Sequence, residues 1–583
     1  MDGNERTPAK VVVESLVAEG VEYVFGLVGS HVLDIYDALI DVPQIRHVVA
    51  KHENNAAFMA EMYGRLTGKP GVVVVTAGPG ALNSISAVAQ AYQNGTPMVH
   101  ISGTVPLSSG VAEFHGTDRP DFLAKTFAEV TKWSTRVERP WEVPSVMARA
   151  FRVAVEGRPG PVHVEFPYDV LRNRQTSIPP YERQVSATVA IDQERLRALA
   201  RRLAGARRPV LCIGRGILTH RVTDRLAELV ERLGAAVMVA GDALGAFPET
   251  HPLFAGSIEA YRLTPSMEEW LRRADAVLVL GMREGSRDIR MIRKVAPAHT
   301  IWVSLAESPT DGEEGDLLFA GRLLDALLAE LARGGGQADG RWREELAAER
   351  VSLHEQLRAT LEPYRNGCPV HFGVAIESLV RQLDARAIVV TGTGNHREWA
   401  RWLVPVRHPF SQVPEGLWGT MGWELPGAIA AKLVHPDRQV VAVTGDGSLL
   451  MSSSDLVTAV ETGANVLIVV MNDACYGMIE SEQKKKFGRF YGVALRSVDF
   501  VAMAESCGAK GFRVERPSDL DGVFQQAIEA TQHAPVIVDV IAGTDYPCPD
   551  ALGLAQRQPE GLGALKERVL DAARRVKRVL VKE

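Results

Sequence analysis

The stretch at residues 439–478, QVVAVTGDGSLLMSSSDLVTAVETGANVLIVVMNDACYGM, predicts one strand–turn–helix–strand unit. Its two apolar runs stop at Gly445-Asp446-Gly447 and at Asn472-Asp473, and the segment 449–463 between them has helical spacing and ends at a glycine. Because parallel strands joined by a crossover helix point the same way, the two aspartates are expected at neighbouring carboxyl ends of one sheet. That edge is where open α/β sheets bind ligands.

The residue types at this edge indicate a cation and an anion. Two neighbouring carboxylates repel each other unless a positive charge lies between them, and oxygen ligands suit Mg²⁺. The glycines beside Asp446 allow close backbone approach, and Ser448 begins a helix whose free N–H groups favour an anion. The pattern predicts a metal-bound diphosphate. A plain glycine bend between a strand and a helix is the alternative for the GDG triplet alone.

The whole pattern, GDGS followed by ND with the second aspartate 27 residues after the first, resembles the motif of thiamine diphosphate (ThDP) enzymes. The resemblance implies ThDP and Mg²⁺ as cofactors, with Asp446, Asp473 and the main-chain carbonyl of Cys475 as metal ligands. Asp473 stands where the family most often has asparagine, which adds one negative charge. The cofactor-binding residues that the resemblance implies here are Asp446, Gly447, Ser448, Asp473, Cys475, Tyr476, Gly477 and Met478.

Length and pattern predict the domain organisation. A chain of 583 residues with 46% hydrophobic content can bury about three cores. Helical and strand patterns alternate, which is typical of doubly wound α/β domains with parallel sheets. With the resemblance, we expect a pyrimidine-binding domain at 1–180, a nucleotide-binding-like middle domain at 190–340, a diphosphate- and Mg²⁺-binding domain at 365–545 and a C-terminal tail helix within 546–583.

Composition excludes several classes of function. The net charge is −6 with no basic stripe, which argues against nucleic acid as a partner. The polar start MDGNERTPAK lacks a signal-peptide core, and no apolar run approaches the roughly 20 residues that span a bilayer. We therefore expect a cytoplasmic protein without membrane contact. The five cysteines have neither metal nor redox spacing, so no disulfide framework is expected.

Glu53 begins the segment HENNAAFMAEMYGR, residues 52–65, whose following face is apolar. A carboxyl group there is expected to be partly protonated through desolvation, which suits a group that shares a proton with an aminopyrimidine. Favourable electrostatics at the helix N-terminus is the alternative. The segment resembles the helix that carries the activating glutamate of ThDP enzymes, which implies a C2-ylide that attacks a carbonyl. It also implies a homodimer or homotetramer with the ThDP site at the subunit interface.

Further matches surround the two ends of the cofactor. Within residues 72–103, Gly78-Pro79 and Asn83, which is expected to begin a helix, match the pyrimidine side. Within residues 387–400, Asn395 and His396 match the diphosphate side. In residues 416–433, Gly419 and Met421 match the segment that wedges an apolar side chain between the cofactor rings. For Met421, a core methionine is the alternative.

Two loops are expected at the substrate. FGLVGSHVLDIYDAL, residues 25–39, resembles the first loop of acetolactate synthase-like enzymes, and benzaldehyde lyase has a histidine at the position of His31. This implies a role in proton transfer for His31, beside Ser30, although a cap or surface residue is the alternative. EFHGTDRPDF, residues 113–122, resembles the loop in which acetolactate synthases carry a glutamine, here Asp121. The substrate residues expected are Val28, Gly29, Ser30, His31, Phe114, His115, Asp121, Glu480 and Glu482, the last replacing a tryptophan.

The middle domain and the tail leave their ligands open. GAFPETHPLF, residues 245–254, is similar to acetolactate synthases, whose middle domain holds FAD, but the strand IWVSLAE at 301–307 lacks the family's paired aspartates. This argues against FAD and leaves the ADP part of coenzyme A, or nothing. The tail is either a solvated helix or a lid that meets a phosphate-bearing substrate such as an acyl-CoA through Arg574, Arg575, Lys577 and Arg578.

Together these features predict a ThDP- and Mg²⁺-dependent lyase or decarboxylase. Its small-molecule substrate would be a 2-hydroxy ketone, a 2-hydroxyacyl-CoA or a 2-oxo acid, because the substrate loops depart from those of acetolactate synthases. An acetolactate synthase-type carboligase that uses pyruvate is the alternative. A non-catalytic ThDP-binding subunit is a third possibility, but such a subunit would not require Glu53.

Overall fold

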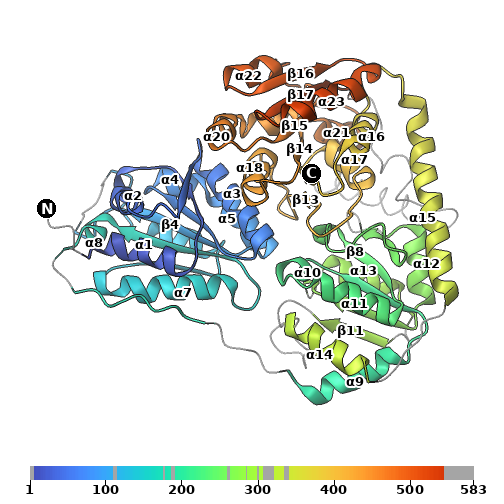
Figure 1. Ribbon diagram of the computed structural model, residues 1–583, viewed down its shortest axis with the longest axis horizontal. Helices are drawn as coiled ribbons and strands as arrows, with labels where there is room; N and C mark the ends of the chain where they lie inside the picture. The colour runs from blue at the N-terminus through green and yellow to red at the C-terminus, as the bar shows by residue number, and fades with distance from the viewer. Residues whose placement is uncertain are drawn as a thin grey trace, which may run out of the picture.

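Three parallel sheets, each with helices on both faces, make up the computed structural model (Figure 1). The N-terminal domain lies at the left in blue and cyan, the middle domain is green, and the C-terminal domain is yellow to red. This architecture confirms the expected fold class. The structure describes residues 6–108, 114–174, 177–185, 191–258, 263–283, 285–297, 301–305, 321–333 and 340–543. The predicted tail helix, with its four basic residues, and the end of the segment 301–307 lie outside these ranges.

The two terminal domains share one topology. The N-terminal sheet has the order β2-β1-β3-β4-β6-β5, and the C-terminal sheet has the order β13-β12-β14-β15-β17-β16, which is the same permutation. Neighbouring strands pair in parallel throughout. The chain order therefore reverses between β1 and β3 and again between β12 and β14, which gives each domain a ligand-binding edge of the kind found at switch points.

The N-terminal domain contains β1 (Tyr23–Gly26), β2 (Arg46–Val49), β3 (Gly71–Val75), β4 (Met98–Thr104), β5 (Trp133–Arg136) and β6 (Pro161–Pro167). Its α-helices are α1 (Pro8–Ala18), α2 (Leu33–Ile40), α3 (Glu53–Thr67), α4 (Pro79–Asn83), α5 (Ile85–Asn94), α6 (Phe122–Ala128), α7 (Val143–Val155) and α8 (Tyr168–Leu171), with 3-10 turns η1 (Ser30–Val32) and η2 (Pro140–Glu142).

The middle sheet, of order β11-β10-β7-β8-β9, contains β7 (Pro209–Ile213), β8 (Ala236–Ala240), β9 (Phe254–Ile258), β10 (Ala276–Leu280) and β11 (Ile301–Leu305). Its helices are α9 (Gln193–Ala204), α10 (Gly216–Thr219), α11 (Thr223–Leu233), η3 (Gly241–Ala243), α12 (Pro265–Arg273), α13 (Arg287–Val295) and α14 (Gly321–Leu331). The long helix α15 (Gly340–Leu361) then runs along one side of the molecule toward the C-terminal domain (Figure 1).

The C-terminal domain contains β12 (Ile388–Thr391), β13 (Gln412–Pro414), β14 (Val440–Gly445), β15 (Leu467–Asn472), β16 (Lys510–Val514) and β17 (Val536–Ile541). Its helices are η4 (Glu362–Tyr364), α16 (Phe372–Gln382), α17 (Asn395–Leu403), α18 (Glu424–Val434), α19 (Asp446–Leu450), η5 (Ser453–Asp455), α20 (Leu456–Thr462), α21 (Gly477–Phe487), α22 (Phe500–Ser506), η6 (Pro517–Asp519) and α23 (Leu520–Ala530).

The central strands are apolar on both faces because helices cover both faces of each sheet. β3, with the sequence GVVVV, and β10, with the sequence AVLVL, are buried along their whole length. Helix ends follow local rules. α1 begins with Thr7, whose hydroxyl accepts a hydrogen bond from the Lys10 N–H, and α3 ends at Gly68 in the left-handed conformation.

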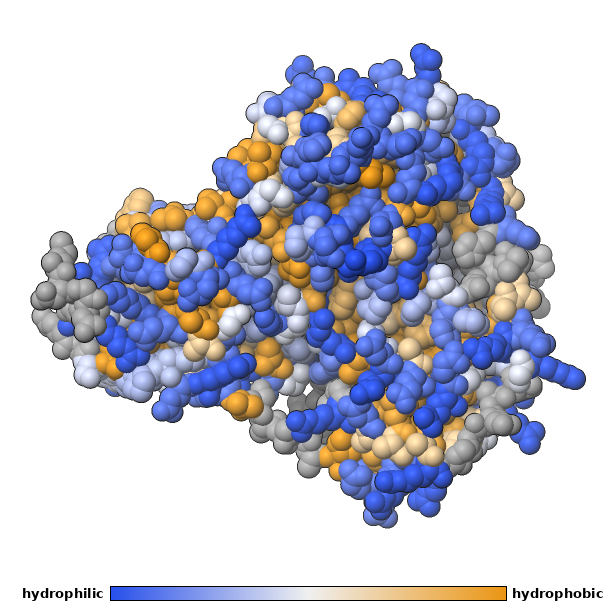
Figure 2. All heavy atoms as spheres, in the orientation of Figure 1, coloured by the Kyte–Doolittle hydropathy of each residue, from blue (hydrophilic) through white to orange (hydrophobic). Residues whose placement is uncertain are grey.

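The N-terminal and C-terminal domains share one hydrophobic core, in which α3 packs against α18. A buried ion pair lies at this junction, where Arg65 Nη2 is 2.5 Å from Glu61 Oε1 and the guanidinium lies 4.4 Å from the centre of the Trp423 ring. On the face drawn in Figure 2, hydrophobic residues also gather at the notch between these two domains. None of the described helices is long and apolar enough to cross a membrane.

Two local predictions were wrong. The helix expected at 449–463 is broken into α19, η5 and α20, and the backbone leaves the helical path at Ser452, with φ at −134°. Asp455, in η5, accepts hydrogen bonds from the Lys51 N–H and the Asn55 side chain of the N-terminal domain. Asn83, expected to begin a helix, ends α4 instead, and α5 begins after Ser84. The first difference lies beside a residue that contacts another domain, and the second lies at the junction of two short helices.

Candidate active site

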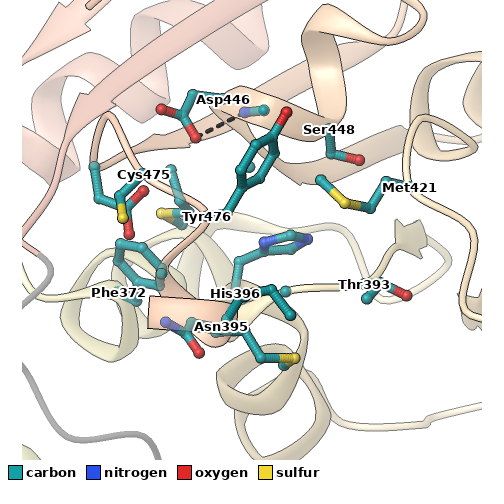
Figure 3. A pocket seen from close by; sticks show the side chains of 17 residues that line it. Phe372, Thr393, Asn395, His396, Met421, Asp446, Ser448, Cys475 and Tyr476 are labelled. Carbon is teal, nitrogen blue, oxygen red and sulfur yellow. Dashed lines mark hydrogen bonds between the residues drawn. The ribbon is translucent and has the colours of Figure 1, made fainter. Parts of the chain in front are cut away.

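A pocket lies at the carboxyl ends of β12, β14 and β15, beside the switch point of the C-terminal sheet (Figure 3). The turns after these strands place polar side chains, glycines and Met421 around one space. Gly419 belongs to the segment just before Met421 and is exposed, with φ at +70°. The predicted cofactor residues that line the pocket are Asn395, His396, Met421, Asp446, Gly447, Ser448, Asp473, Cys475, Tyr476, Gly477 and Met478.

The structure brings together the two predicted metal-binding carboxylates, of which Asp446 is buried and Asp473 half-buried. Burial raises the pKa of Asp446, whose Oδ1 accepts a hydrogen bond of 2.7 Å from the Gly447 N–H. Burial and the charge of Asp446 together raise the pKa of Asp473 to about 7. Two such groups repel each other in the absence of a cation, so the pair fits a divalent metal that binds oxygen.

The Cys475 side chain is suited to a structural role. Burial, followed by the charges of Glu480, Asp473 and Asp446, raises the pKa of the thiol to about 12, so the sulfur stays protonated. Within the described part of the chain, no three His, Cys, Asp or Glu side chains are grouped as a metal site. A Mg²⁺ ion here would need oxygen ligands in addition to the two aspartates, and the main-chain carbonyl of Cys475 is the one that the family resemblance implies.

Glu424 was missed by the sequence interpretation, although it fixes the diphosphate side of the pocket. The Ser448 hydroxyl donates to Glu424 Oε1 at 2.8 Å and accepts a hydrogen bond of 2.7 Å from the Gly422 N–H. His396 Nε2 lies 3.6 Å from the same carboxylate, which is 1% exposed. The signal in the sequence was a single acidic residue in the apolar run WELPGAIAA, which reads equally well as an ordinary helix start.

Glu53 lies in the N-terminal domain as the half-buried first residue of α3. The Asn83 side-chain amide donates a hydrogen bond of 2.9 Å to Glu53 Oε2. Gly80 lies so close that a Cβ atom there would be 3.3 Å from Glu53 Oε1. Gly78, with φ at +55°, and Pro79 form the turn that begins α4, the short helix that ends at Asn83.

The first predicted substrate loop places His31 at the edge of β1. His31 is 6% exposed, and its Nδ1 lies 3.1 Å from Ser30 Oγ and 3.4 Å from Thr76 Oγ1. Gly29 packs closely on Thr76, since a Cβ at Gly29 would be 2.4 Å from the Thr76 Cβ. Val28 is exposed. This loop is therefore held against the turn that follows β3.

The second substrate loop is only partly gathered at this edge. The His115 ring stacks on the His31 ring with centroids 5.3 Å apart, and Phe114, which is 73% exposed, stacks on His115. Asp121 instead forms an exposed ion pair of 2.7 Å with Lys125, which holds the pKa of the carboxyl group below its usual value.

On α21, the two predicted substrate residues lie differently. Glu480 is 7% exposed and lies 3.1 Å from Lys484 Nζ. Glu482 is exposed.

The described residues that line the diphosphate pocket all belong to the C-terminal domain, whereas Glu53 and His31 belong to the N-terminal domain. The chain thus carries two half-sites. A cofactor that contacts both half-sites would have to lie between the surface of an N-terminal domain and the surface of a C-terminal domain.

A second cleft, of about 360 Å³, lies at the carboxyl ends of the middle-domain strands β7, β8 and β10. Its lining includes Ser286, whose side chain caps α13. Burial and the charge of Asp242 raise the pKa of Asp288 in this cleft to about 6. The charged residues around the cleft are Arg158, Arg215, Arg283 and Arg287 with Asp242 and Asp288.

Family models match all three domains in order. Residues 6–122 match the N-terminal TPP binding domain of thiamine pyrophosphate enzymes, residues 196–312 match their central domain, and residues 392–540 match their C-terminal TPP binding domain. The chain belongs to the thiamine pyrophosphate enzyme family. Thiamine pyrophosphate is ThDP, so the family expected from the GDGS…ND motif is confirmed.

Relatives cover almost the whole of this ThDP enzyme. The acetolactate synthase isozyme 3 large subunit of Escherichia coli is 32% identical over 562 residues, covering 93% of this chain and 96% of the relative. The acetolactate synthase large subunit of Haemophilus influenzae is 31% identical over 554 residues, covering 91% and 94%. The acetolactate synthase of Mycobacterium bovis is 30% identical over 573 residues, covering 92% and 88%. The chain is thus an acetolactate synthase-like ThDP enzyme.

Proposed function

We propose that this protein is a ThDP- and Mg²⁺-dependent carboligase of the acetolactate synthase type, which forms a C–C bond next to a carbonyl. The similarity to acetolactate synthase large subunits over more than nine tenths of the chain carries the proposal. It favours the carboligase over the lyase or decarboxylase as the main function. Within this proposal, Glu53, Asp446 and Met421 are the residues that we assign to the ThDP chemistry.

The residues of the pocket have separable roles in this proposal. Asp446, Asp473 and the Cys475 carbonyl would hold Mg²⁺, and Asn395 and His396 would contact the diphosphate. When bound, ThDP supplies a carbon nucleophile and an electron sink. Glu53 would exchange a proton with the aminopyrimidine, and Met421 would pack as an apolar wedge against the cofactor.

We also propose that two copies of the chain complete each site. The half-site of Glu53 and the diphosphate pocket lie on separate domains, and exposed apolar side chains accompany both. Val28, Leu82 and Phe114 are exposed on the N-terminal domain, and Trp418 and Met451 are exposed on the C-terminal domain. A homodimer or homotetramer would bury such residues around the cofactor.

A lyase that cleaves a 2-hydroxy ketone or a 2-hydroxyacyl-CoA is the second candidate function. The observation in its favour is the substrate side, where His31 is buried beside His115 and neither Asp121 nor Glu482 reproduces the acetolactate synthase pattern. Carboligation and cleavage are opposite directions at the same type of bond. The residues assigned to the cofactor therefore serve both candidates.

The middle-domain cleft supports binding of a phosphate-bearing ligand. Its arginines and the N-terminus of α13 suit an anion, and its volume lies within the range of small-molecule sites. We propose the ADP part of a nucleotide or of coenzyme A as the occupant. FAD is the competing occupant, and its bound flavin would make the purified protein yellow.

One experiment separates these functions. The protein, supplied with ThDP and Mg²⁺, is incubated with pyruvate or with a 2-hydroxy ketone, and products and tightly bound small molecules are identified by mass spectrometry. Acetolactate from pyruvate supports the carboligase, whereas cleavage of the 2-hydroxy ketone without consumption of pyruvate supports the lyase. Asp446→Ala is the matched control that should abolish either reaction. Binding of ThDP without turnover of any carbonyl substrate would favour a non-catalytic subunit.

A further inference from the structure

We propose that His115 is a positioning residue for His31, and that the stacked imidazoles act as a pair in which His31 alone exchanges a proton with a hydroxyl or carbonyl oxygen of the substrate. The proposal rests on the proposed function, because it concerns the substrate side of the same site. It adds a partner for His31 and a chemical class for the group that His31 meets.

The His31 ring is fixed in orientation. Its hydrogen-bond contacts with described residues both use Nδ1, to Ser30 Oγ at 3.1 Å and to Thr76 Oγ1 at 3.4 Å. Behind the ring, a Cβ at Gly103 would be 2.5 Å from the His31 Cβ, so β4 approaches closely. Nε2 is therefore the nitrogen left to face a substrate, and a proton passes between a substrate O–H and this atom.

The His115 backbone is held in a conformation that non-glycine residues seldom adopt, with φ at +67°. Its carbonyl oxygen packs against Gly78, where a Cβ would be only 2.4 Å away. The loop is thus docked on the turn that carries the pyrimidine-side residues. Such backbone strain persists where the surroundings over-determine it, which is common at functional sites.

The docked loop brings the two imidazoles together. Their centroids are 5.3 Å apart with an angle of 28° between the planes, and Phe114 covers the other side of the pair by stacking on His115 at 3.9 Å. His115 Nδ1 is buried and has no hydrogen-bond partner among the described residues. Because the His115 ring is held in this way, it limits the rotation of His31. Its Nδ1 meets neither bulk water nor a hydrogen-bonding side chain among the described residues.

The positive groups near His31 disfavour a positive charge on its own ring. The pKa of His31 is lowered by burial first, then by His115 and by Arg172. Tyr168 meets the ring edge-on at 5.7 Å, and Arg172 lies over Tyr168 and pairs with Asp34 at 2.9 Å. His31 is therefore neutral at neutral pH, ready to accept a proton from a hydroxyl group and, once charged, to return it.

The test measures His31 itself in the holoenzyme with ThDP and Mg²⁺ and without substrate. Deuterium exchange at the imidazole C2 carbon, followed by mass spectrometry of peptides across a pH series, gives the titration midpoint of one histidine. His115→Gln removes both the ring and its charge, whereas His115→Phe keeps a stacking ring and removes the charge. In both variants, we expect the His31 midpoint to rise by about half a pH unit or more. His220→Gln, in the middle domain, is the control that leaves the midpoint unchanged.

Turnover separates positioning from charge. With the substrate established by product analysis, His115→Gln should lower kcat about tenfold with little change in KM, while His115→Phe should retain more of kcat because the stacking ring remains. An unchanged His31 midpoint in both variants would overturn the proposal. Because the exchange measurement needs no turnover, that failure is distinct from failure of the proposed carboligase function.

Discussion

The Asn83 side-chain amide donates a hydrogen bond of 2.9 Å to Glu53 Oε2 and so links the end of α4 to the start of α3. The bond occupies one carboxylate oxygen and leaves Oε1 for the cofactor. It also holds the carboxylate in one rotamer on an exposed face that we assign to the subunit interface. Asn83 is thereby the residue that aims Glu53.

Asn83→Ala is predicted to lower kcat about tenfold, which corresponds to the loss of one hydrogen bond to a charged group. ThDP affinity should change less, because the diphosphate contacts lie in the other half-site. Steady-state kinetics and a ThDP titration measure the two effects. Asn54→Ala is the control, since Asn54 Oδ1 accepts its hydrogen bond from the Ala87 N–H and not from Glu53. Equal kcat in Asn83→Ala and wild type would remove Asn83 from this role.

The two metal-site aspartates should respond differently to neutralisation. Asp473→Asn keeps a side-chain oxygen for Mg²⁺ and removes a carboxyl group whose pKa burial and the charge of Asp446 raise to about 7. We therefore expect it to raise the melting temperature of the metal-free protein and to retain ThDP binding. Asp446→Ala removes a ligand and should weaken Mg²⁺-dependent ThDP binding at least tenfold. Calorimetric titration and thermal unfolding check both, and loss of binding in Asp473→Asn would contradict the assignment.

Two buried histidines should make the N-terminal domain sensitive to acid. Burial lowers the pKa of His100, which lies 2.7 Å from Ser84 Oγ, to about 3 and lowers the pKa of His163 well below 6.5. Below pH 6.5 the unfolded chain binds protons at these imidazoles that the folded protein does not. For each histidine, the free energy of unfolding therefore falls by about 1.4 kcal/mol per pH unit as the pH drops from 6.5.

The matched comparison uses His100→Gln, which keeps an amide donor for Ser84 and does not titrate. Its melting temperature should fall less than that of the wild type between pH 7 and pH 5. The comparison is needed because Glu165 acts in the opposite direction. Burial raises its pKa to about 8, so its contribution to stability falls as the pH rises from 4.5 to 8. Identical acid sensitivity of the two proteins would refute the role of His100.

The ion pair at the domain junction should be costly to break from one side. The side chains of Glu61 and Arg65 are 0% and 2% exposed, and Gln90 and Asn94 also donate to Glu61. Either Glu61→Ala or Arg65→Met leaves a buried charge without its partner, which costs about 3–5 kcal/mol. The double variant should be less destabilised than the sum of the single variants. Thermal unfolding of the four proteins gives the coupling, and simple additivity would count against it.

Much of the fold could be predicted from the sequence because it rests on local patterns. The apolar runs and their glycine turns gave the strands around Asp446 and Asp473, and the repeated alternation gave three doubly wound domains. The break in the expected helix at Ser452 could not be predicted, because neither glycine nor proline marks it and the nearby Asp455 hydrogen-bonds to Lys51 and Asn55 in another domain.

The site shows the same division. Sequence motifs predict that residues such as Met421 and His396 bind the cofactor, and both line the pocket. The role of Glu424 was not predicted, because it depends on Ser448 and His396 converging on this residue in space. The stacking of His115 on His31 likewise depends on the docking of one loop on another.

We propose above that Glu53 activates ThDP bound in the diphosphate pocket of a second copy of the chain. The most direct measurement is hydrogen–deuterium exchange at the C2 carbon of enzyme-bound ThDP, stopped by acid and read by NMR, because it needs no knowledge of the substrate. We predict that the wild type accelerates this exchange by at least a hundredfold over free ThDP, and that Glu53→Gln binds ThDP and loses the acceleration. Equal exchange in the two proteins would contradict the role of Glu53 in activating ThDP.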